Sequence, residues 1–199
     1  GRGGGRGAGR GRGGAVGGVG GGRWGGDAEG RRERERCMRE RIECNELDIQ
    51  VATYTRKNSS QDLEELIKGA DCIVHLAGEN RPKDEKDFDV VNAGLTASLC
   101  DVMRSSGKNI SFILASSTQA EFDNAYGMSK LNAEASVKML EVDTACPVYV
   151  YRLPGVFGKW CKPHYNSVVA TFCHNISHNL PIQVNNSDFE LSLVYIDDV

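Results

Sequence analysis

Tyr126 and Lys130 stand four residues apart in the stretch Tyr126-Gly127-Met128-Ser129-Lys130. On a helix this spacing puts the phenol and the ammonium group on one face, about one turn apart. A neighbouring cation stabilises the phenolate, so the pKa of the tyrosine is expected to fall from its usual ~10 towards neutrality. Such a tyrosine can donate a proton to, or accept one from, an alcohol/ketone pair.

Three hydroxyl side chains precede this pair at the end of an apolar run. Residues 112–115 are Phe-Ile-Leu-Ala, a buried-strand pattern, and Ser116, Ser117 and Thr118 follow directly. The carboxyl ends of parallel strands form the edge where open α/β sheets bind ligands. Alone, Tyr-x-x-x-Lys often occurs by chance and is more typical of a solvated helix face, but the hydroxyls at the strand end reverse this preference and favour an active site.

Ser117, Tyr126 and Lys130 together resemble the active site of the extended short-chain dehydrogenase/reductases, the NAD(P)-dependent sugar epimerases and dehydratases. The resemblance covers residues 47–199 and is specific over residues 110–175. Within it, four stretches are similar to the bacterial capsular polysaccharide reductases, which act on UDP-linked 2-acetamido-2,6-dideoxy sugars on the route to UDP-N-acetyl-L-fucosamine. These stretches are Tyr151-Arg152-Leu153-Pro154, Phe157-Gly158-Lys159-Trp160-Cys161-Lys162-Pro163, Tyr165-Asn166-Ser167-Val168 and Ala170-Thr171-Phe172-Cys173.

The resemblance implies a Rossmann-like, doubly wound parallel sheet of the α/β class and hydride transfer to a C4 ketone. Tyr126 would donate the proton, and Ser117 would hydrogen-bond the carbonyl. Thr118 is the second candidate for this hydrogen bond. Lys130 would favour the phenolate and hold the nicotinamide ribose. The cofactor implied is NADP, with NAD as the alternative, and the substrate is a UDP-sugar.

Further cofactor contacts are expected at the ends of other strands. Arg56 follows the strand signal of Leu47, Ile49 and Val51, and it points to a 2′-phosphate unless it is a solvated loop charge. The apolar run 72–78 ends in small residues that would let a ribose and phosphate approach the backbone. The expected cofactor residues are Arg56, Ala77, Gly78, Asn92, Tyr126, Lys130, Leu153 and Pro154. In the family, an Asn at the position of Asn92 braces the site through backbone hydrogen bonds. The family usually has another Asn at the position of Gly155, and this chain departs from the family there.

The nucleotide-sugar is expected along residues 159–180. Lys159, Lys162 and Asn166 offer donors for a diphosphate, and Trp160 or Tyr165 can stack on a base or sugar. A surface loop followed by an amphipathic helix is the alternative interpretation.

The same stretch also contains side chains that could bind zinc. Cys161 and His164 have a ligand-like spacing, and His174 and His178 lie one helical turn apart. Because Cys173 lies in an apolar stretch and the resembled family uses this helix without metal, we predict no metal site.

The elements that must position these residues follow from the periodicity of apolar side chains. Strands are expected near 47–54, 72–78, 110–116 and 147–151. Helices are expected from Ser59 or Ser60 to Gly69, from about Asp84 to Ser105, and from about Asn124. His75 lies inside the apolar run 72–78, so we expect it to be a packed strand residue rather than a catalytic one.

The composition divides the chain at about residue 45. Seventeen of the 24 glycines lie in residues 1–30, and residues 1–45 carry eleven arginines against six acidic residues. We expect this segment to be low-complexity, disordered or non-native, with the partial reductase domain at 46–199. Arg-Gly tracts sometimes bind RNA, but this one has Trp24 as its lone aromatic residue. The folded part is acidic, which argues against nucleic acid or an anionic membrane as its partner.

Residues 14–20 fit Gly-x-x-Gly-x-x-Gly, the pattern of a phosphate-binding loop. Such a loop requires an apolar strand before it and an amphipathic helix after it. Residues 1–13 are not strand-like, and residues 31–41 are highly charged, with Cys37, Met38 and Ile42 as candidate core contacts. We therefore favour the interpretation that the family's first strand, glycine loop and first helix are replaced, so the chain would be catalytically weak or inactive.

The end of the chain at Leu193–Val199 corresponds to the middle of the resembled reductase domain. In the family, the rest of that domain and a zinc-binding cupin domain follow, so we expect a C-terminally truncated domain. We predict a cytoplasmic protein for three reasons. The seven cysteines are scattered without paired spacing, the sequence has no apolar run of ~18–20 residues, and no signal peptide is visible. Whether the protein forms a homodimer is left open as a possibility. The alternatives to an enzyme are a nucleotide-sugar-binding remnant without turnover and an RNA-binding tail on an inert domain.

Overall fold

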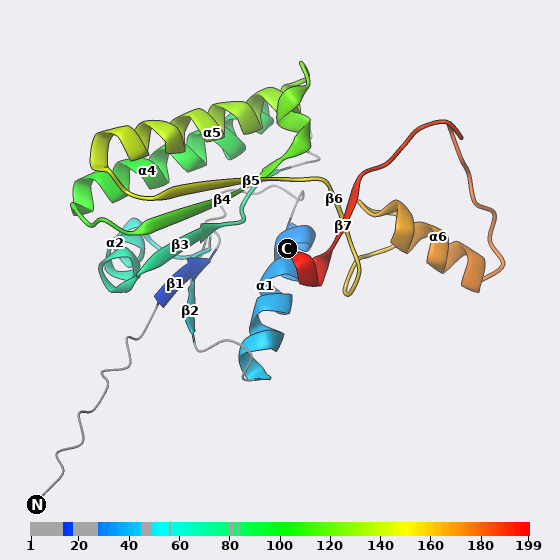
Figure 1. The fold of residues 1–199 in the computed structure, drawn as a ribbon, viewed down its shortest axis with the longest axis horizontal. Coiled ribbons are helices and arrows are strands. Elements are labelled where there is room, and N and C mark those ends of the chain that lie inside the picture. Colours follow the sequence, from blue (N-terminus) through cyan, green and yellow to red (C-terminus); the bar gives the residue numbers. More distant parts are fainter. Residues whose placement is uncertain (1–13, 18–27, 45–48, 56, 80–81, 83) are drawn as a thin grey trace, which may run out of the picture.

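A five-stranded parallel sheet forms the centre of the protein in a computed structural model that describes residues 14–17, 28–44, 49–55, 57–79, 82 and 84–199. The strands follow the order β2-β1-β3-β4-β5 (Figure 1). They are β1 (Gly14–Gly17), β2 (Gln50–Thr53), β3 (Cys72–His75), β4 (Ser111–Ser117) and β5 (Val148–Leu153). The expected α/β Rossmann-like fold is confirmed.

Helices cover both faces of the sheet. Figure 1 shows α4 and α5 over one face and α1 against the other. Their bounds are α1 (Ala28–Glu43), α2 (Ser60–Gly69), α4 (Leu95–Ser106) and α5 (Ala125–Thr144). The helix expected over 84–105 is divided into α3 (Lys86–Phe88), a π-helical turn η1 (Asp89–Gly94) and α4.

Helix α2 begins where the sequence predicts. The Ser59 side chain accepts from the Asp62 N–H, and the Asp62 carboxylate accepts from the Ser59 N–H at 2.7 Å. This capping box satisfies two backbone donors that the first turn of a helix leaves open. Leu63 and Ile67 then face the core.

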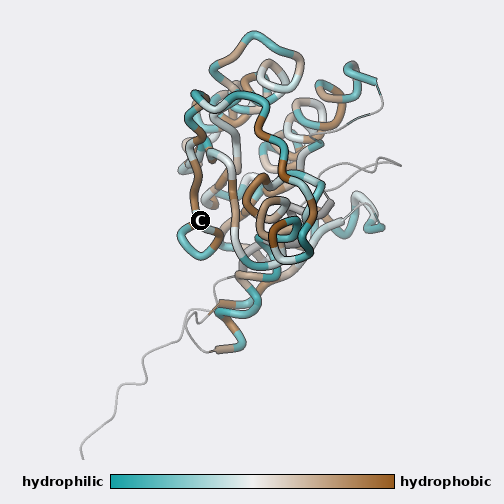
Figure 2. The backbone as a smooth tube through the Cα atoms, turned by 90° about the vertical axis from the view of Figure 1, so that its right-hand side faces the viewer, coloured by the Kyte–Doolittle hydropathy of each residue, from teal (hydrophilic) through white to brown (hydrophobic). Residues whose placement is uncertain are grey.

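The main core lies between the sheet and helices α4 and α5. Phe112 and Leu114 alternate with half-buried neighbours along β4 and pack with Leu99 of α4 and Val137 of α5. Figure 2 shows hydrophobic stretches of the tube in the middle of the molecule and hydrophilic ones at many outer turns. The seven cysteines are free thiols.

Two stretches of the arginine- and glycine-rich segment differ from expectation. Residues 14–17 form β1, which pairs with both β2 and β3, and residues 28–43 form α1. The expectation of a segment without regular structure is therefore wrong for these two stretches. Residues 1–13 and 18–27, which include the second half of the glycine pattern, lie outside the described residues.

The chain after β5 forms a smaller unit beside the sheet's carboxyl edge. It contains β6 (Gly155–Phe157), which pairs in parallel with β7 (Leu193–Tyr195), and helix α6 (Val168–Ser177). Short 3₁₀ turns are η2 (Thr118–Glu121) and η3 (Ile196–Asp198). In the part of the chain that the structure describes, no helix is long and apolar enough to cross a membrane.

Candidate active site

The start of α5 is held tightly against the turn that follows β4. The Asn124 side chain caps the helix by accepting from the Gly127 N–H at 2.8 Å. A Cβ atom at Gly127 would collide with the carbonyl oxygens of Gln119 and Phe122. The glycine after Tyr126 is thus required by close backbone approach, which fixes the tyrosine beside the end of β4.

A polar cavity of about 160 Å³ opens at this edge of the sheet. Ser117 at the end of β4, together with Tyr126 and Lys130 from the first turns of α5, lines it. Leu153 and Pro154, at the end of β5 and just after it, form another wall. The structure therefore brings the three predicted catalytic side chains and two predicted cofactor residues to one cavity, although their roles stay predictions.

Lys130 is nearly buried, with 7% of its surface exposed. Its Nζ lies 5.6 Å from the centroid of the Tyr126 ring, and Phe88 packs on the same ring with centroids 5.5 Å apart. A Cβ atom at Gly78 would lie 2.7 Å from Lys130 Nζ. The small residue at the end of the 72–78 run therefore leaves room for the ammonium group.

Asn92 connects three parts of the site from inside the π-helical turn η1. Its Oδ1 accepts from the Glu79 N–H at 2.6 Å, and its Nδ2 donates to the Glu79 carbonyl at 3.0 Å and to Ser129 Oγ at 2.8 Å. Ser129 in turn donates to the Tyr126 carbonyl at 2.7 Å. The Asn92 side chain thus links the Glu79 backbone to Ser129, and its bracing role in the site stays a prediction. Such π-helical turns are frequent at functional sites.

His75 extends this network into the core. Its Nε2 lies 3.0 Å from Thr96 Oγ1, which donates its proton to the Asn92 carbonyl at 2.6 Å. His75 Nε2 must therefore be the donor, and Nδ1 has no hydrogen-bond partner among the described residues. Burial, with a smaller effect from the Lys130 charge, lowers the pKa of His75 to about 3. The residue is a neutral, packed histidine, as its place inside the strand suggested.

Glu134 forms a second buried polar cluster, one helical turn beyond Lys130. It accepts from Ser116 Oγ at 2.5 Å and from two nitrogens of Arg152 at 2.9 and 2.8 Å. Burial raises the pKa of Glu134, but the bonds from Arg152 and Ser116 outweigh it, so the pKa lies below its ordinary value. The cluster ties α5 to the ends of β4 and β5, whose next residues line the cavity.

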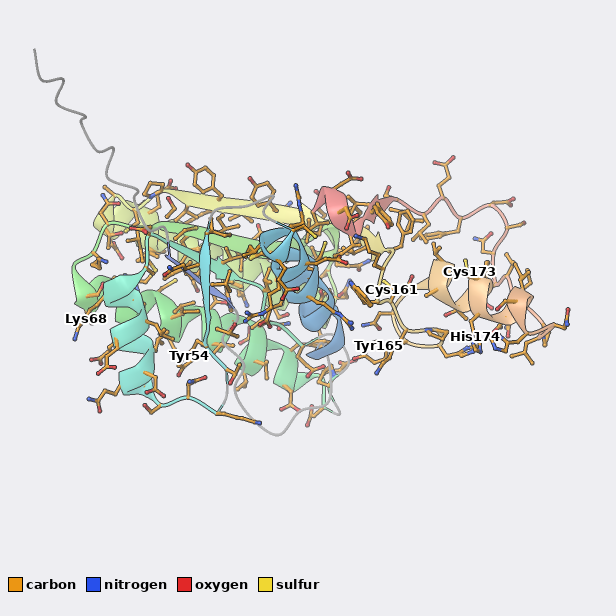
Figure 3. The ribbon with its side chains drawn as sticks, turned by 90° about the horizontal axis from the view of Figure 1, so that it is seen from below. Tyr54, Lys68, Cys161, Tyr165, Cys173 and His174 are labelled. Carbon is orange, nitrogen blue, oxygen red and sulfur yellow. The ribbon has the colours of Figure 1, made fainter. Side chains whose placement is uncertain are left out.

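The predicted substrate residues divide into two groups. Lys162, Tyr165 and Asn166 line the polar cavity with Tyr126. In Figure 3 the labelled Cys161 and Tyr165 lie between α1 and α6, and Cys173 and His174 lie on α6 itself. A second, more open cavity of about 560 Å³ continues from Tyr126 and Tyr165 towards Gln183.

Lys159 and Trp160 are not among the residues that line either cavity. Lys159 Nζ pairs with carboxylates of Glu40 at 3.3 Å and Asp197 at 3.0 Å. Trp160 stacks under the Arg36 guanidinium, 3.5 Å from the ring centroid. Local ion pairing and cation–π stacking with α1 thus place these two side chains away from the site.

Other predicted positions have simpler outcomes. Thr118 begins η2 and is absent from the described lining of the polar cavity, whereas the Ser117 hydroxyl accepts from the Gln119 N–H at 3.2 Å. Ala77 is buried. Gly155 packs against β7, where a Cβ atom would lie 2.9 Å from Leu193 Cδ2. Arg56 lies outside the described residues.

Two features of the site were missed from sequence. Arg34 of α1 lines the polar cavity, and the segment 31–41 offered only its charge as a signal. Glu134 recurs with Lys130, Val137 and Leu140 at helical spacing, so a carboxylate on the inward stripe was the available signal.

The three histidines near α6 form a ring cluster. The ring centroids of His164 and His174 are 5.3 Å apart, and those of His174 and His178 are 4.2 Å apart. Partial desolvation and the two neighbouring rings lower the pKa of His174. Cys161 lines the polar cavity instead, and the described residues contain no group of three His, Cys, Asp or Glu side chains suited to a metal ion.

Comparison with known sequences adds a family context to this geometry. The profile described as the NAD dependent epimerase/dehydratase family matches residues 31–199. The chain is 54% identical over 151 residues to a UDP-2-acetamido-2,6-beta-L-arabino-hexul-4-ose reductase of Pseudomonas aeruginosa. The match covers 76% of this chain and 41% of the relative, so the chain spans about two fifths of that protein's length.

Solved structures show the same fold. The capsular polysaccharide assembling protein CapF from Staphylococcus aureus matches with a TM-score of 0.71 and 36% identity over 92% of this chain and 47% of its own. A UDP-glucose 4-epimerase from Thermotoga maritima, solved with UDP-glucose, matches with a TM-score of 0.72 over 93% of this chain and 70% of its own. At 16% identity the second likeness supports the fold alone.

Proposed function

Because this chain belongs to the NAD dependent epimerase/dehydratase family, we propose that it carries the site of a nicotinamide-dependent reductase for the C4 ketone of a UDP-linked deoxy-amino sugar. One observation carries the proposal: Ser117, Tyr126 and Lys130 line the same polar cavity. The substrate class is supported by the reductase to which the chain is 54% identical. A role in capsular or surface polysaccharide synthesis is supported by the likeness to CapF.

The residues of the cavity divide the chemistry between them. Tyr126 donates a proton to the carbonyl oxygen as the ketone becomes an alcohol, and the Ser117 hydroxyl hydrogen-bonds that oxygen. Lys130 stabilises the phenolate that Tyr126 leaves behind. Asn92 acts through Ser129, which bonds the Tyr126 carbonyl and keeps the first turn of α5 in place.

The residues present fit a nicotinamide cofactor, which when bound supplies the hydride. Lys130, Leu153 and Pro154 line the polar cavity, and Gly78 leaves room for the Lys130 ammonium, since a Cβ atom at Gly78 would lie 2.7 Å from Nζ. Lys130, Leu153 and Pro154 would hold the cofactor, and the Lys130 ammonium would donate hydrogen bonds to its ribose hydroxyls. We prefer NADP over NAD because Arg56 follows β2 in the sequence, where a basic residue can meet the 2′-phosphate that distinguishes NADP.

The proposal is tested by NADPH binding and by turnover of a UDP-linked 4-keto-6-deoxy sugar. We expect the chain to bind NADPH and to oxidise it slowly in the presence of the ketone. Replacing Tyr126 by Phe should lower kcat by about 10²–10⁴-fold, since the general acid is lost, and should weaken NADPH binding much less, because Lys130 and the other expected cofactor residues remain.

Two results would contradict this function. Absence of NADPH and NADH binding at millimolar cofactor excludes the reductase site. A chain that binds nucleotide-sugar equally well with and without the Tyr126→Phe substitution, and that never oxidises NADPH, is instead a non-catalytic binding protein.

A further inference from the structure

Arg34 brings a guanidinium group from α1 to the polar cavity. It is half-buried and donates from Nη2 to the carbonyl of Leu76 at 3.4 Å, directly before the small residues that end the 72–78 run. It lines the cavity together with Tyr126 and Lys130. A side chain from the atypical N-terminal segment therefore reaches the same space as the predicted catalytic residues.

Helix α1 is fixed to the rest of the protein around Arg34. The Cys37 thiol donates to Asp197 at 3.0 Å, and burial and this bond raise the pKa of Cys37 to about 11. Lys159 bridges Glu40 of the helix and the same Asp197 of η3. Because these contacts join α1 to elements near the end of the chain, Arg34 is held at the cavity by tertiary structure.

The face of α1 that carries Arg34 looks towards the sheet. Arg34, Cys37, Met38 and Arg41 recur at helical spacing and all line an apolar cavity of about 400 Å³ between α1 and the strands. Arg34 lines both this cavity and the polar one, whereas Arg41 lines only the apolar one. Arg34 is therefore the arginine of this helix face that reaches the polar cavity.

The charge of the polar cavity is strongly one-sided. Arg34, Lys130 and Lys162 line it, and none of the described lining residues carries a carboxylate. This contrasts with the net charge of −3 of the whole chain. With Lys130 beside the Tyr126 ring, the other two cations can meet an anionic part of the ligand. The planar fork of a guanidinium suits the paired oxygens of a phosphate.

We propose that Arg34, together with Lys162, binds the diphosphate of the nucleotide ligand at this cavity. The proposal rests on the proposed function, which supplies two ligands with this chemistry, the dinucleotide cofactor and the UDP-sugar. A phosphate contact from a side chain of α1 differs from the backbone contacts that a glycine loop provides.

The test compares Arg34→Gln with two matched variants in the full 199-residue chain. Arg41→Gln removes the same charge from the same helix face without touching the polar cavity. Arg34→Lys keeps the positive charge but loses the planar guanidinium, so its affinities can be compared instead if Arg34→Gln unfolds. Affinities for NADPH, UDP and uridine are measured by calorimetry at two salt concentrations, and circular dichroism melting checks the fold.

We expect Arg34→Gln to weaken the binding of NADPH or UDP by roughly 10-fold or more, with a smaller salt dependence, and Arg34→Lys to lie between the two. Arg41→Gln should stay within about twofold of the unsubstituted chain, and uridine affinity should not change with Arg34, because uridine carries no phosphate. A loss confined to NADPH assigns the contact to the cofactor, and a loss confined to UDP assigns it to the sugar nucleotide.

Equal affinities in the unsubstituted chain and in both Arg34 variants overturn this inference and leave the proposed function intact. Equal losses in Arg34→Gln and Arg41→Gln also overturn it, because they indicate a general charge effect. Failure of the unsubstituted chain to bind either nucleotide overturns both proposals.

Discussion

Lys130 and Gly78 are in direct contact at the candidate site: a Cβ atom at Gly78 would lie 2.7 Å from Lys130 Nζ and 3.2 Å from Asn92 Oδ1. Since the ammonium is the end of a flexible side chain, it can move away at little cost in stability. Gly78→Ala should therefore change the free energy of unfolding by less than about 1 kcal/mol. It should nevertheless weaken NADPH binding by roughly tenfold, because Lys130 loses its position.

Gly69→Ala is the matched control for this prediction, since a Cβ atom there meets nothing within 4 Å. Both variants are measured by NADPH titration and urea unfolding. An unchanged affinity in Gly78→Ala would mean that the position of Lys130 is irrelevant to the cofactor.

Gly127→Ala, unlike Gly78→Ala, should clearly lower the free energy of unfolding. Its Cβ would meet the carbonyl oxygens of Gln119 and Phe122, and backbone atoms cannot rotate away as a lysine does. We expect a loss of about 1–3 kcal/mol in the free energy of unfolding, measured by urea denaturation. Gly94→Ala, whose Cβ would have its nearest neighbour at 3.9 Å, should lose much less. Equal stability of the two variants contradicts the close approach described at α5.

Local spacing was enough to predict the helix and the strand end that carry the candidate site residues. The four-residue interval between Tyr126 and Lys130 required only a helix, and the Ser-Ser-Thr end of β4 required only a parallel strand. The capping box at Ser59 is similarly a matter of a few neighbouring residues. Such features depend on contacts that are short in sequence, so a pattern records them directly.

Long-range contacts account for what the sequence did not predict. Arg34 reaches the cavity because α1 is anchored to η3 through Cys37 and Asp197, which are 160 residues apart. Lys159 is held away from the site by the partners that this packing supplies. Strand β1 was missed because Gly14–Gly17 has little strand character of its own and is defined by pairing with β2 and β3 on either side.

His75 should make stability depend on pH in the mildly acidic range. Its pKa of about 3 in the folded protein lies below its ordinary value of 6.5, so the unfolded chain binds the proton more readily. Its contribution is fully present above pH 6.5 and is lost as the pH falls towards 3. One such group gives a slope of about 1.4 kcal/mol per pH unit.

The measurement is urea unfolding between about pH 7.5 and about pH 4.5, a range that spans the ordinary histidine pKa. His75→Asn should be less stable at neutral pH, since it loses core packing, and should show a flatter dependence on pH. Exposed His178→Asn should leave the dependence nearly unchanged. A slope that persists in His75→Asn assigns the titration to another group.

Glu134 should determine stability at lower pH, through the ion pair of its buried carboxylate with the partly exposed Arg152. The pKa of this carboxyl is lowered in the folded protein from its ordinary value of 4.5, so its contribution is present above that value. The contribution disappears as the pH falls through the lowered pKa. Glu134→Gln should cost about 1.5–3 kcal/mol at neutral pH, and this cost should shrink on acidification because the unsubstituted carboxyl also becomes neutral.

Removing the other partner distinguishes pairing from packing at this cluster. Arg152→Met leaves the buried carboxylate of Glu134 with the Ser116 hydroxyl as its remaining side-chain donor among the described residues, an arrangement that is strongly unfavourable. Adding Glu134→Gln to Arg152→Met should therefore raise the urea midpoint, although each single change lowers it. Asp143→Asn, which breaks the exposed pair with Arg104, provides the comparison and should cost no more than about 1 kcal/mol. If the double variant is less stable than Arg152→Met, the two side chains contribute independently and the ion pair does not hold α5 to the ends of β4 and β5.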